Sequence, residues 1–449
     1  MFGIAMVSGL LAAQSRQTVR TPVAQSARTR WFRDAGFGLY ITWGLSSIPA
    51  GVWKGQSIAG EGERIMRTAR IPLREYEGLA KQFNPKEFDA EKWAQFAEDA
   101  GAKYIVVEAK GPDGFAMYRS AVSKYNVYDA TPFHRDPLRE LAMACAKHGL
   151  RLGIAYSDRE DWASPDAPGN DWDFGPDAQK NFDLYLHSKA EPQVRELLTG
   201  YGPVGMFRFD SVAENQTPAP PSLLSLVRRL RPGALIEGAA IPPGDYMALA
   251  SDRMPTKVQP GAWVVRTTMN RTWGFKAEDN NWLSTDELIF NLVDAVSKGG
   301  GYAVNVGPTA EGIIPRPSLP ELADMGEWLD DNGDAIYGAG PTPFGEELAG
   351  RLWRCTTRPG KLYITLFRWP DGPFELDHVK GLVTKAYLMT DEDETEWKVT
   401  QNGQHVTVAL PKDPPIEGEV PERMNPVMFQ NGQRAHLHRV LVLETKNAR

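Results

Sequence analysis

Cysteine and histidine are both scarce in this chain. Its 449 residues include two cysteines and seven histidines, and the histidines are dispersed with no His-Glu-x-x-His pattern. A catalytic metal or another cofactor is therefore not predicted. Cys145 and Cys355 lie far apart in the sequence, and we expect both to be buried free thiols, with a disulfide as the alternative.

The chain also lacks a basic excess and long apolar runs. Asp and Glu outnumber Lys and Arg by 57 to 50, which gives a formal net charge of −7. No positive field would attract a phosphate backbone, so nucleic acid is not an expected partner. No run approaches the roughly 18 consecutive apolar residues of a membrane span, so none is predicted.

The N-terminus carries the features of a targeting segment. Residues 1–15 form an apolar, small-residue run, and an Arg-containing polar stretch follows. This pattern is typical of a secretory leader, although it lacks a basic start. We expect residues 1–28 to be a leader or a disordered segment and the protein to be periplasmic or secreted. A cytoplasmic protein with an N-terminal extension is the alternative.

Short apolar runs alternate with amphipathic helical stretches over residues 29–340. Helices are expected around residues 88–100, 137–148 and 192–198. The apolar runs lie at 37–44, 103–111, 151–158, 204–211, 234–240, 263–269 and 301–308. Strands that alternate with helices form parallel βαβ units, and about eight such units close into a (β/α) TIM-like barrel.

The pattern changes after residue 340. Short alternating strands follow, separated by Gly, Pro, Asn and Asp turns, which predicts a C-terminal antiparallel β-sandwich over residues 341–449. A chain of this length exceeds one ordinary core, so two domains are expected, with the barrel at 29–340 as the catalytic one.

Two carboxylates close adjacent apolar runs. The active site of a parallel barrel gathers at the C-terminal ends of its strands. Asp210 directly follows one run, with a helix N-cap as its alternative role. Glu237 ends the next, with a salt bridge to a neighbouring Arg as the alternative. If they lay about 5 Å apart, they would match a retaining glycosidase, one attacking the anomeric carbon and one protonating the leaving oxygen.

Aromatic side chains lie near the same strand ends. Trp43, Tyr156 and Trp273 are the main examples. Their flat apolar faces suit the C–H groups of a sugar, with plain packing as the alternative for each. The pattern therefore favours a carbohydrate ligand.

Several segments resemble the motifs of a known family. They are WFRDAGFGLYITWG (31–44), FNPKEFDAEKWAQFAEDAGAKYIVVEAKGPDGF (83–115), HRDPLRELAMACAKHGLRLGIAYS (134–157), ELLTGYGPVGMFRFD (196–210), SKGGGYAVNVGPTAEGIIP (297–315) and GEWLDDNGDAIYG (326–338). Together they are similar to the α-L-fucosidases of glycoside hydrolase family 29, over nearly the whole chain from residue 31 to 444.

The resemblance implies roles for individual residues. It makes Asp210 the nucleophile of a retaining double displacement on an oligosaccharide or glycoconjugate. It makes Tyr156 and Trp43 sugar-contacting residues. Lys110, Asp113 and Trp273 occupy positions where the family keeps its own Lys, Asp and Trp.

The departures from the family pattern are concentrated in the sugar site. The family's first sugar-binding His is Thr42 here, and its paired His are Gly111 and Pro112. The Trp two residues before the nucleophile is Arg208, and Val264 stands where the family often has Glu, so the acid/base does not transfer. Losing several matched donors should change the substrate.

A polar pocket lined by Thr42, Glu108 and Arg208 suggests an unusual or acidic sugar. Arg208 could form a fork for a carboxylate or sulfate, with a salt bridge to Asp210 or Glu237 as the alternative.

Three functions follow from these observations. The first is an exo-acting α-glycosidase of the fucosidase type, with Asp210 as nucleophile, Glu237 as the leading acid/base candidate, and Glu108 and Glu63 in reserve. The second is a carbohydrate-binding protein that has lost the chemistry. The third is elimination or isomerisation with Lys110, Glu108 or Tyr156 as base, which is disfavoured because such reactions commonly use a metal or nucleotide cofactor.

Overall fold

The computed structural model describes residues 27–209, 219–238, 244–250, 253–345, 352–412 and 438–446. The expected leader lies outside these ranges up to residue 26, and so does the predicted nucleophile Asp210. No helix within the described ranges is both long enough and apolar enough to cross a membrane. Cys145 and Cys355 are buried free thiols, as predicted.

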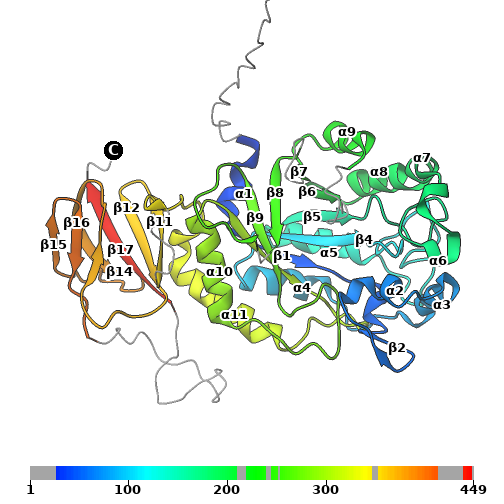
Figure 1. The fold of residues 1–449 in the computed structure, drawn as a ribbon, viewed down its shortest axis with the longest axis horizontal. Helices are drawn as coiled ribbons and strands as arrows, with labels where there is room; N and C mark the ends of the chain where they lie inside the picture. Colours follow the sequence, from blue (N-terminus) through cyan, green and yellow to red (C-terminus); the bar gives the residue numbers. More distant parts are fainter. Residues whose placement is uncertain are drawn as a thin grey trace, which may run out of the picture.

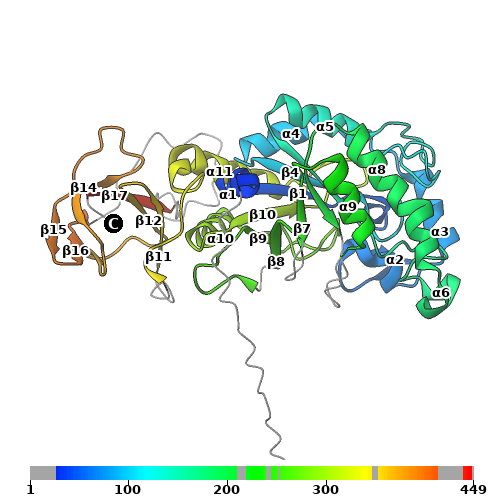
Figure 2. The same cartoon turned by 90° about the horizontal axis from the view of Figure 1, so that it is seen from above.

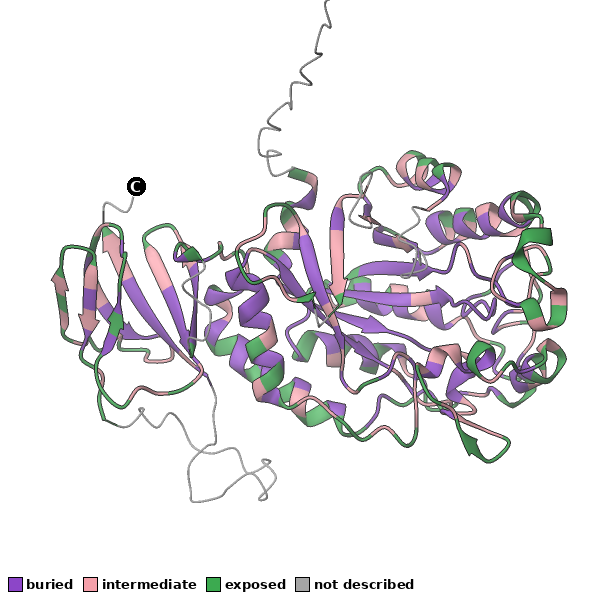
Figure 3. Cartoon of the chain, viewed as in Figure 1, coloured by how far each residue is buried: buried purple, intermediate pink, exposed green. Residues whose placement is uncertain are grey.

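Eight parallel strands close into a barrel, which confirms the predicted fold class (Figure 1). Strand β1 closes it by pairing with both β4 and β10. The strands are β1 (Phe37–Ile41), β4 (Tyr104–Lys110), β5 (Arg151–Tyr156), β6 (Val204–Phe209), β7 (Leu235–Gly238), β8 (Tyr246–Ala250), β9 (Trp263–Thr268) and β10 (Gly301–Val306). Strands β1 and β10 are buried over their whole length (Figure 3), because side chains fill the barrel and helices cover it.

Helices surround the barrel and begin with recognisable caps. Asp89 and Asp136 accept hydrogen bonds from the first turns of α4 and α5, and Ser284 and Glu287 form a capping box at α10. The longer helices are α4 (Ala90–Asp99), α5 (Pro137–Lys147), α8 (Glu191–Gly200), α9 (Pro221–Leu230), α10 (Thr285–Ser297) and α11 (Ser318–Asn332). The shorter elements are α1 (Arg30–Ala35), α2 (Ile65–Thr68), α3 (Leu73–Glu77), α6 (Asp171–Phe174), α7 (Phe182–Tyr185) and the hairpin β2 (Val52–Trp53) with β3 (Gln56–Ser57).

Strand β8 is the barrel strand that the sequence pattern missed. No helix among the described residues separates β7, β8 and β9, so the strand–helix alternation that marks the other strands is absent here. The chain returns to β8 through a close approach of Gly238 to Gly244. A Cβ on Gly244 would lie 2.2 Å from the Cα of Gly238, so only glycine fits.

The C-terminal region folds into two antiparallel sheets, as predicted. One sheet has the order β11 (Trp353–Arg358), β12 (Lys361–Leu366), β17 (Arg439–Lys446) and β14 (Leu382–Leu388). The other has the order β13 (Phe374–Leu376), β16 (His405–Val408) and β15 (Val399–Asn402). A separate apolar cluster, which includes Cys355, Ile364 and Leu441, fills the space between them.

The sheets stand beside α10 and α11 rather than at the mouth of the barrel, as Figure 2 shows from above. Asp294 of α10 pairs with Lys298 at 2.6 Å and with Arg354 of β11 at 2.5 Å, and all three side chains are at most 10% exposed. The indole of Trp328 in α11 donates to the carbonyl of His438 at 2.6 Å. This polar junction fixes the sheets against the barrel away from the strand ends.

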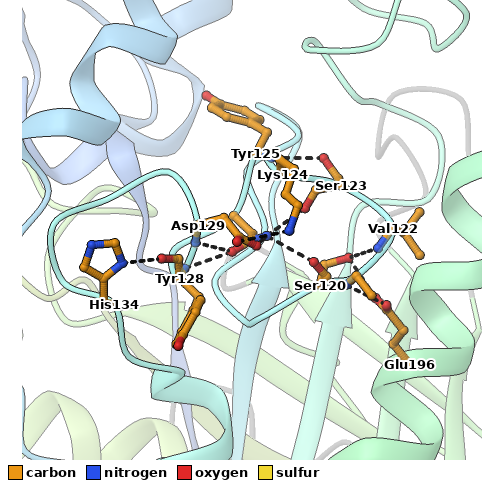
Figure 4. Close-up of polar contacts among 11 residues, drawn as sticks. Ser120, Val122, Ser123, Lys124, Tyr125, Tyr128, Asp129, His134 and Glu196 are labelled. Atoms are coloured by element: carbon orange, nitrogen blue, oxygen red, sulfur yellow. Dashed lines mark hydrogen bonds and ion pairs between the residues drawn. The ribbon is translucent and has the colours of Figure 1, made fainter.

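Hydrogen bonds within the loop after β4, and between this loop and α8, fix its backbone (Figure 4). The carboxylate of Glu196 in α8 accepts hydrogen bonds from the Ser120 hydroxyl at 2.7 Å and the Ala121 amide at 2.8 Å. Asn126 donates to Asp129 at 2.8 Å and accepts from the backbone of Tyr128. These bonds satisfy backbone groups that have no strand or helix partner, and they order the segment that follows the candidate site residues of β4.

Candidate active site

Alternation along the barrel strands places one layer of polar side chains inside the barrel. The inner face carries small or apolar residues lower down, such as Val106, Met206 and Val264. Two residues further along each strand, the same face presents Glu108, Arg208 and Arg266, because side chains repeat every second residue. Tyr40 of β1 and Glu237 of β7 belong to the same inner layer. The polar layer therefore lies toward the C-terminal ends of the strands, where barrel active sites form.

Glu237 holds two guanidinium groups in this layer. Its Oε1 lies 3.3 Å from the Nε of Arg208 and 3.2 Å from an Nη of Arg266. Its Oε2 accepts a hydrogen bond from the Tyr246 hydroxyl at 3.3 Å. The salt bridge considered as the alternative for Glu237 and Arg208 is thus present. We call Arg208 and Arg266 the arginine pair.

Aromatic rings lie within cation–π distance of the arginine pair. Both guanidinium groups lie 5.6 Å from the centre of the Tyr40 ring, and that of Arg266 also lies 5.8 Å from the Trp273 ring. Arg208 donates to the Tyr40 hydroxyl at 3.1 Å. Burial raises the pKa of Tyr40 well above its usual range, although the two arginines oppose that shift, so the phenol stays neutral.

A cleft of about 630 Å³ opens over this layer. Among the predicted site residues, it is lined by Glu63, Glu108, Arg208 and Trp273. A smaller pocket adjoins it through the shared residues Glu63 and Glu108, and this pocket also contains Thr42, Trp43 and Asp113. A larger hollow of about 740 Å³ lies along α4 and α5 on the outside of the barrel. We take the cleft and the adjoining smaller pocket as the site, because both lie at the C-terminal ends of the strands, whereas the hollow along α4 and α5 does not.

Glu108 occupies space that a side chain at position 111 would need. An ideal Cβ on Gly111 would lie 2.4 Å from the Glu108 Oε1, closer than any real contact. A register shift between Glu108 and Lys110 marks a bulge in β4 at this point, and such bulges re-aim side chains near active sites. By the resemblance to the α-L-fucosidases, position 111 would carry one of the family's paired histidines. The Glu108 carboxylate occupies the space that the Cβ of such a side chain would need.

The smaller pocket combines packing and polar contacts. Thr42 donates to Asn305 at 2.8 Å. The Trp43 indole donates to the Thr309 carbonyl at 2.9 Å, and its ring packs against Phe88 and other aromatic rings. Asp113 accepts from the Phe115 amide and the Tyr76 hydroxyl at 3.0 and 3.1 Å. Burial raises the pKa of Asp113 to about 6, against these two bonds.

Lys110 and Tyr156 are enclosed in the protein and line neither pocket. The Lys110 ammonium lies 3.3 Å from the Asp161 carboxylate, which also pairs with Lys189 at 2.8 Å. The Tyr156 hydroxyl donates to Gln193 at 2.9 Å. We call Lys110, Asp161 and Lys189 the lysine cluster. A direct sugar contact by Lys110 or Tyr156 stays a prediction.

Several residues that line the cleft lie outside the predicted site set, Tyr40 among them, whereas the sequence places Arg266 with the polar residues that close an apolar run. Arg266 and Tyr40 lie on inner-face positions of β9 and β1, and the two-residue alternation through Thr42 would have identified Tyr40. The described residues contain no group of three or more His, Cys, Asp or Glu arranged to hold a metal ion. Asp210 comes directly after β6 in the sequence, but its distance from Glu237 lies outside what the structure describes.

Comparisons with known proteins agree with one another. The family model for α-L-fucosidase matches residues 6–334. The tissue α-L-fucosidase of Rattus norvegicus is 30% identical over 415 residues, which cover 86% of each chain. The α-L-fucosidase from Vibrio sp. strain EJY3 superimposes with a TM-score of 0.81 at 30% identity, over 94% of this chain and 74% of that one. Isoenzyme 1 from Paenibacillus thiaminolyticus gives 0.78 at 31%, over 94% and 99%. The chain therefore belongs to the α-L-fucosidase family, glycoside hydrolase family 29, and is a glycosidase.

Proposed function

We propose that the protein is an exo-acting, retaining α-glycosidase that removes a terminal α-linked, fucose-like sugar from an oligosaccharide or glycoconjugate. One observation carries the proposal: the polar inner layer and the cleft of this glycosidase lie at the C-terminal ends of the barrel strands, and Asp210 follows one of these strands in the sequence. A cleft of about 630 Å³ has the size of a small-ligand site, which suits a terminal sugar. The relatives, which are named as fucosidases, favour hydrolysis over the binding-only alternative.

In this proposal Asp210 attacks the anomeric carbon and forms a glycosyl ester. A second carboxyl group protonates the leaving oxygen and then, as the carboxylate, takes a proton from the water that cleaves the ester. Glu237 is the candidate from strand order, but both its oxygens accept hydrogen bonds from Arg208, Arg266 and Tyr246. Because proton donation by Glu237 would break these contacts, we place Glu108 and Glu63 first for this role.

The sugar site combines the cleft with the smaller pocket. We propose that Glu108, Arg208 and Trp273 contact the sugar in the cleft, and that Thr42, Trp43 and Asp113 shape the adjoining pocket. Lys110 and Tyr156 lie buried behind these pockets, where they bond to Asp161 and Gln193. Since Glu108 fills space beside Gly111 and histidine donors are replaced, we propose that the preferred sugar differs from unmodified fucose.

The test is turnover of a panel of nitrophenyl glycosides, including the α-L-fucoside, α-L-galactoside and α-L-rhamnoside, by wild type and Asp210→Asn. We expect one glycoside to be cleaved and the variant to lose about three or more orders of magnitude in kcat, because a nucleophile has no substitute. The first product seen by NMR should be the α-anomer. A β-anomer, or full activity of Asp210→Asn, would contradict the proposal. Binding of sugar without turnover in wild type would support the binding-only alternative.

We also propose that the protein is exported. Support comes from the apolar run at residues 1–15 and the Arg-containing stretch after it. N-terminal sequencing of protein recovered from the producing cells and from their surroundings tests this. Exported protein that begins after a cleaved N-terminal segment would support the proposal, and protein confined to the cytoplasm with an intact N-terminus would contradict it.

A further inference from the structure

The arginine pair is an unusual feature for the wall of a neutral-sugar site. Arg208 and Arg266 both line the cleft, and their guanidinium groups meet at one oxygen of Glu237. Their side chains are 18% and 16% exposed, so each is mostly withdrawn from water but reaches the cleft. Each guanidinium carries five donors in a fixed plane, and those of Arg208 reach Glu237 and the Tyr40 hydroxyl.

One hydrogen-bond donor of Arg266 has no acceptor among the described residues. This donor, the Nη1 group, is buried. The rest of the guanidinium is fixed by Glu237 and by the rings of Tyr40 and Trp273. A buried donor without an acceptor is unfavourable, and here it belongs to a side chain that lines the cleft. A ligand oxygen that reached this Nη1 from the cleft, with a small rotation of the guanidinium group, would remove that deficit.

A matching ligand group follows from the geometry of the donors. Planar guanidinium groups bind carboxylate and sulfate through paired hydrogen bonds, and such charge-assisted bonds are stronger than those to neutral hydroxyls. The low exposure of the pair reduces the screening of these charges by water. A neutral sugar hydroxyl would accept from a donor without the charge-assisted part of this interaction.

We propose that the sugar cleaved by this enzyme carries an anionic group, a sulfate ester or a carboxylate, and that Arg266 binds it together with Arg208. Glu237 is then the residue that holds both guanidinium groups in position. This inference rests on the proposed glycosidase function and names its substrate class. It adds Arg266 to the specificity-determining residues and gives Glu237 a positioning role.

Direct binding tests the inference without requiring turnover. Isothermal titration would give the Kd of wild type for L-fucose, L-fucose 2-, 3- and 4-sulfate, D-galacturonate and L-iduronate. We expect at least one anionic sugar to bind about tenfold or more tightly than L-fucose, the size of a charge-assisted hydrogen bond. The sulfates and the uronates separate the two sources of the anion. The preference should weaken with added salt.

Variants then assign the preference to the arginine pair. Arg266→Met should reduce the advantage of the anionic sugar to about threefold or less, and Arg266→Lys should keep part of it, because lysine retains the charge but not the fork. Arg228→Met is the matched control. Arg228 shares the carboxylate of Asp245 with Arg28, but none of the three lines the cleft, so sugar binding should stay as in wild type.

Two results would overturn the inference. One is that no anionic sugar binds more tightly than L-fucose, including the case in which none binds. The other is an anionic preference that survives in both Arg266→Met and Arg208→Met. Failure of the proposed function is a different result, because it shows in the Asp210→Asn turnover experiment and leaves these Kd values interpretable.

Discussion

The lysine cluster and the arginine pair share one arrangement of charges, but the first is buried in the protein and the second lines the cleft. In each, two cations share one carboxylate: Lys110 and Lys189 at Asp161, and Arg208 and Arg266 at Glu237. Lys110 and Asp161 have no exposed side-chain surface. The Lys110 ammonium also donates hydrogen bonds to the backbone carbonyls of Gly111 and Glu160. The arginine pair instead lines the cleft.

On the proposed function, access to the cleft, rather than the ratio of cations to carboxylates, separates the structural cluster from the ligand-binding one. Burial works to raise the pKa of Asp161, but attraction to Lys110 and Lys189 outweighs it and lowers the pKa. The Asp161 carboxylate therefore stays ionised and paired with Lys110 and Lys189. Glu237 pairs with its two arginines in the same way, but both arginines line a cleft that a ligand can enter. The first cluster should control stability and the second should control recognition.

Breaking the lysine cluster should give the largest effect on stability. In Asp161→Asn the fully buried Lys110 loses its paired charge, so the free energy of unfolding should fall by about 3–5 kcal/mol. Guanidinium unfolding followed by tryptophan fluorescence measures this. The double variant Lys110→Met with Asp161→Asn should recover part of the loss. An Asp161→Asn variant as stable as wild type would mean that the cluster carries no structural role.

A buried carboxyl without a cation should respond to pH. Asp113 contacts two hydrogen-bond donors but no cation within ion-pair distance in the described ranges, and burial raises its pKa from 3.8 to about 6. The folded state thus holds this proton more tightly than the unfolded chain. As pH rises from about 4 to about 6, wild type should lose about 2–3 kcal/mol relative to Asp113→Asn. Parallel unfolding curves for the two proteins would contradict the raised pKa.

Changing the carboxylate of the arginine pair should affect recognition more than stability. In Glu237→Gln we expect KM for the best glycoside to rise about tenfold, because the guanidinium groups lose their anchor, while kcat changes by less than about threefold. Steady-state kinetics over a range of pH measures both. A loss of about 100-fold or more in kcat, restored by a better leaving group, would instead identify Glu237 as the acid.

The smallest effect is expected where the cleft meets β4. Gly111 does not have a positive φ, so Gly111→Ala should fold with a stability change within about 1 kcal/mol. Its new Cβ displaces the Glu108 carboxylate and should change kcat/KM about three- to tenfold. Glu108→Gln is the comparison. If the two changes act through the same carboxylate, the double variant should lose little more than Glu108→Gln alone, and fully additive losses would count against this.

Much of the architecture could be predicted from the sequence because hydrophobic periodicity reports burial directly. Residues 37–41 form a continuous apolar run, residues 301–306 are apolar apart from Asn305, and both segments are buried barrel strands. Strand β8 was missed because no α-helix among the described residues lies between it and β7. The polar side chains at strand ends were also predictable, since Glu108, Arg208 and Glu237 each close such a run.

The contacts between strands were not predictable. The approach of Gly111 to Glu108 depends on a bulge in β4, and Arg266 meets Glu237 only because β8 and β9 bring them together around the barrel. Likewise, Lys110 lies at a strand end in sequence, but its side chain pairs with Asp161 of a later loop. Such choices depend on three-dimensional packing, which a single sequence does not report.

Covalent trapping tests the central claim most directly. A 2-deoxy-2-fluoro glycosyl fluoride of the sugar that the enzyme prefers should accumulate as an ester, because the fluorine at C2 slows both steps while the fluoride leaving group at C1 speeds only the formation of the ester. Mass spectrometry of the digested protein should then place the label on Asp210, and Asp210→Asn should take up none. A label on another carboxylate, or rapid hydrolysis of the glycoside by Asp210→Asn, would contradict the account.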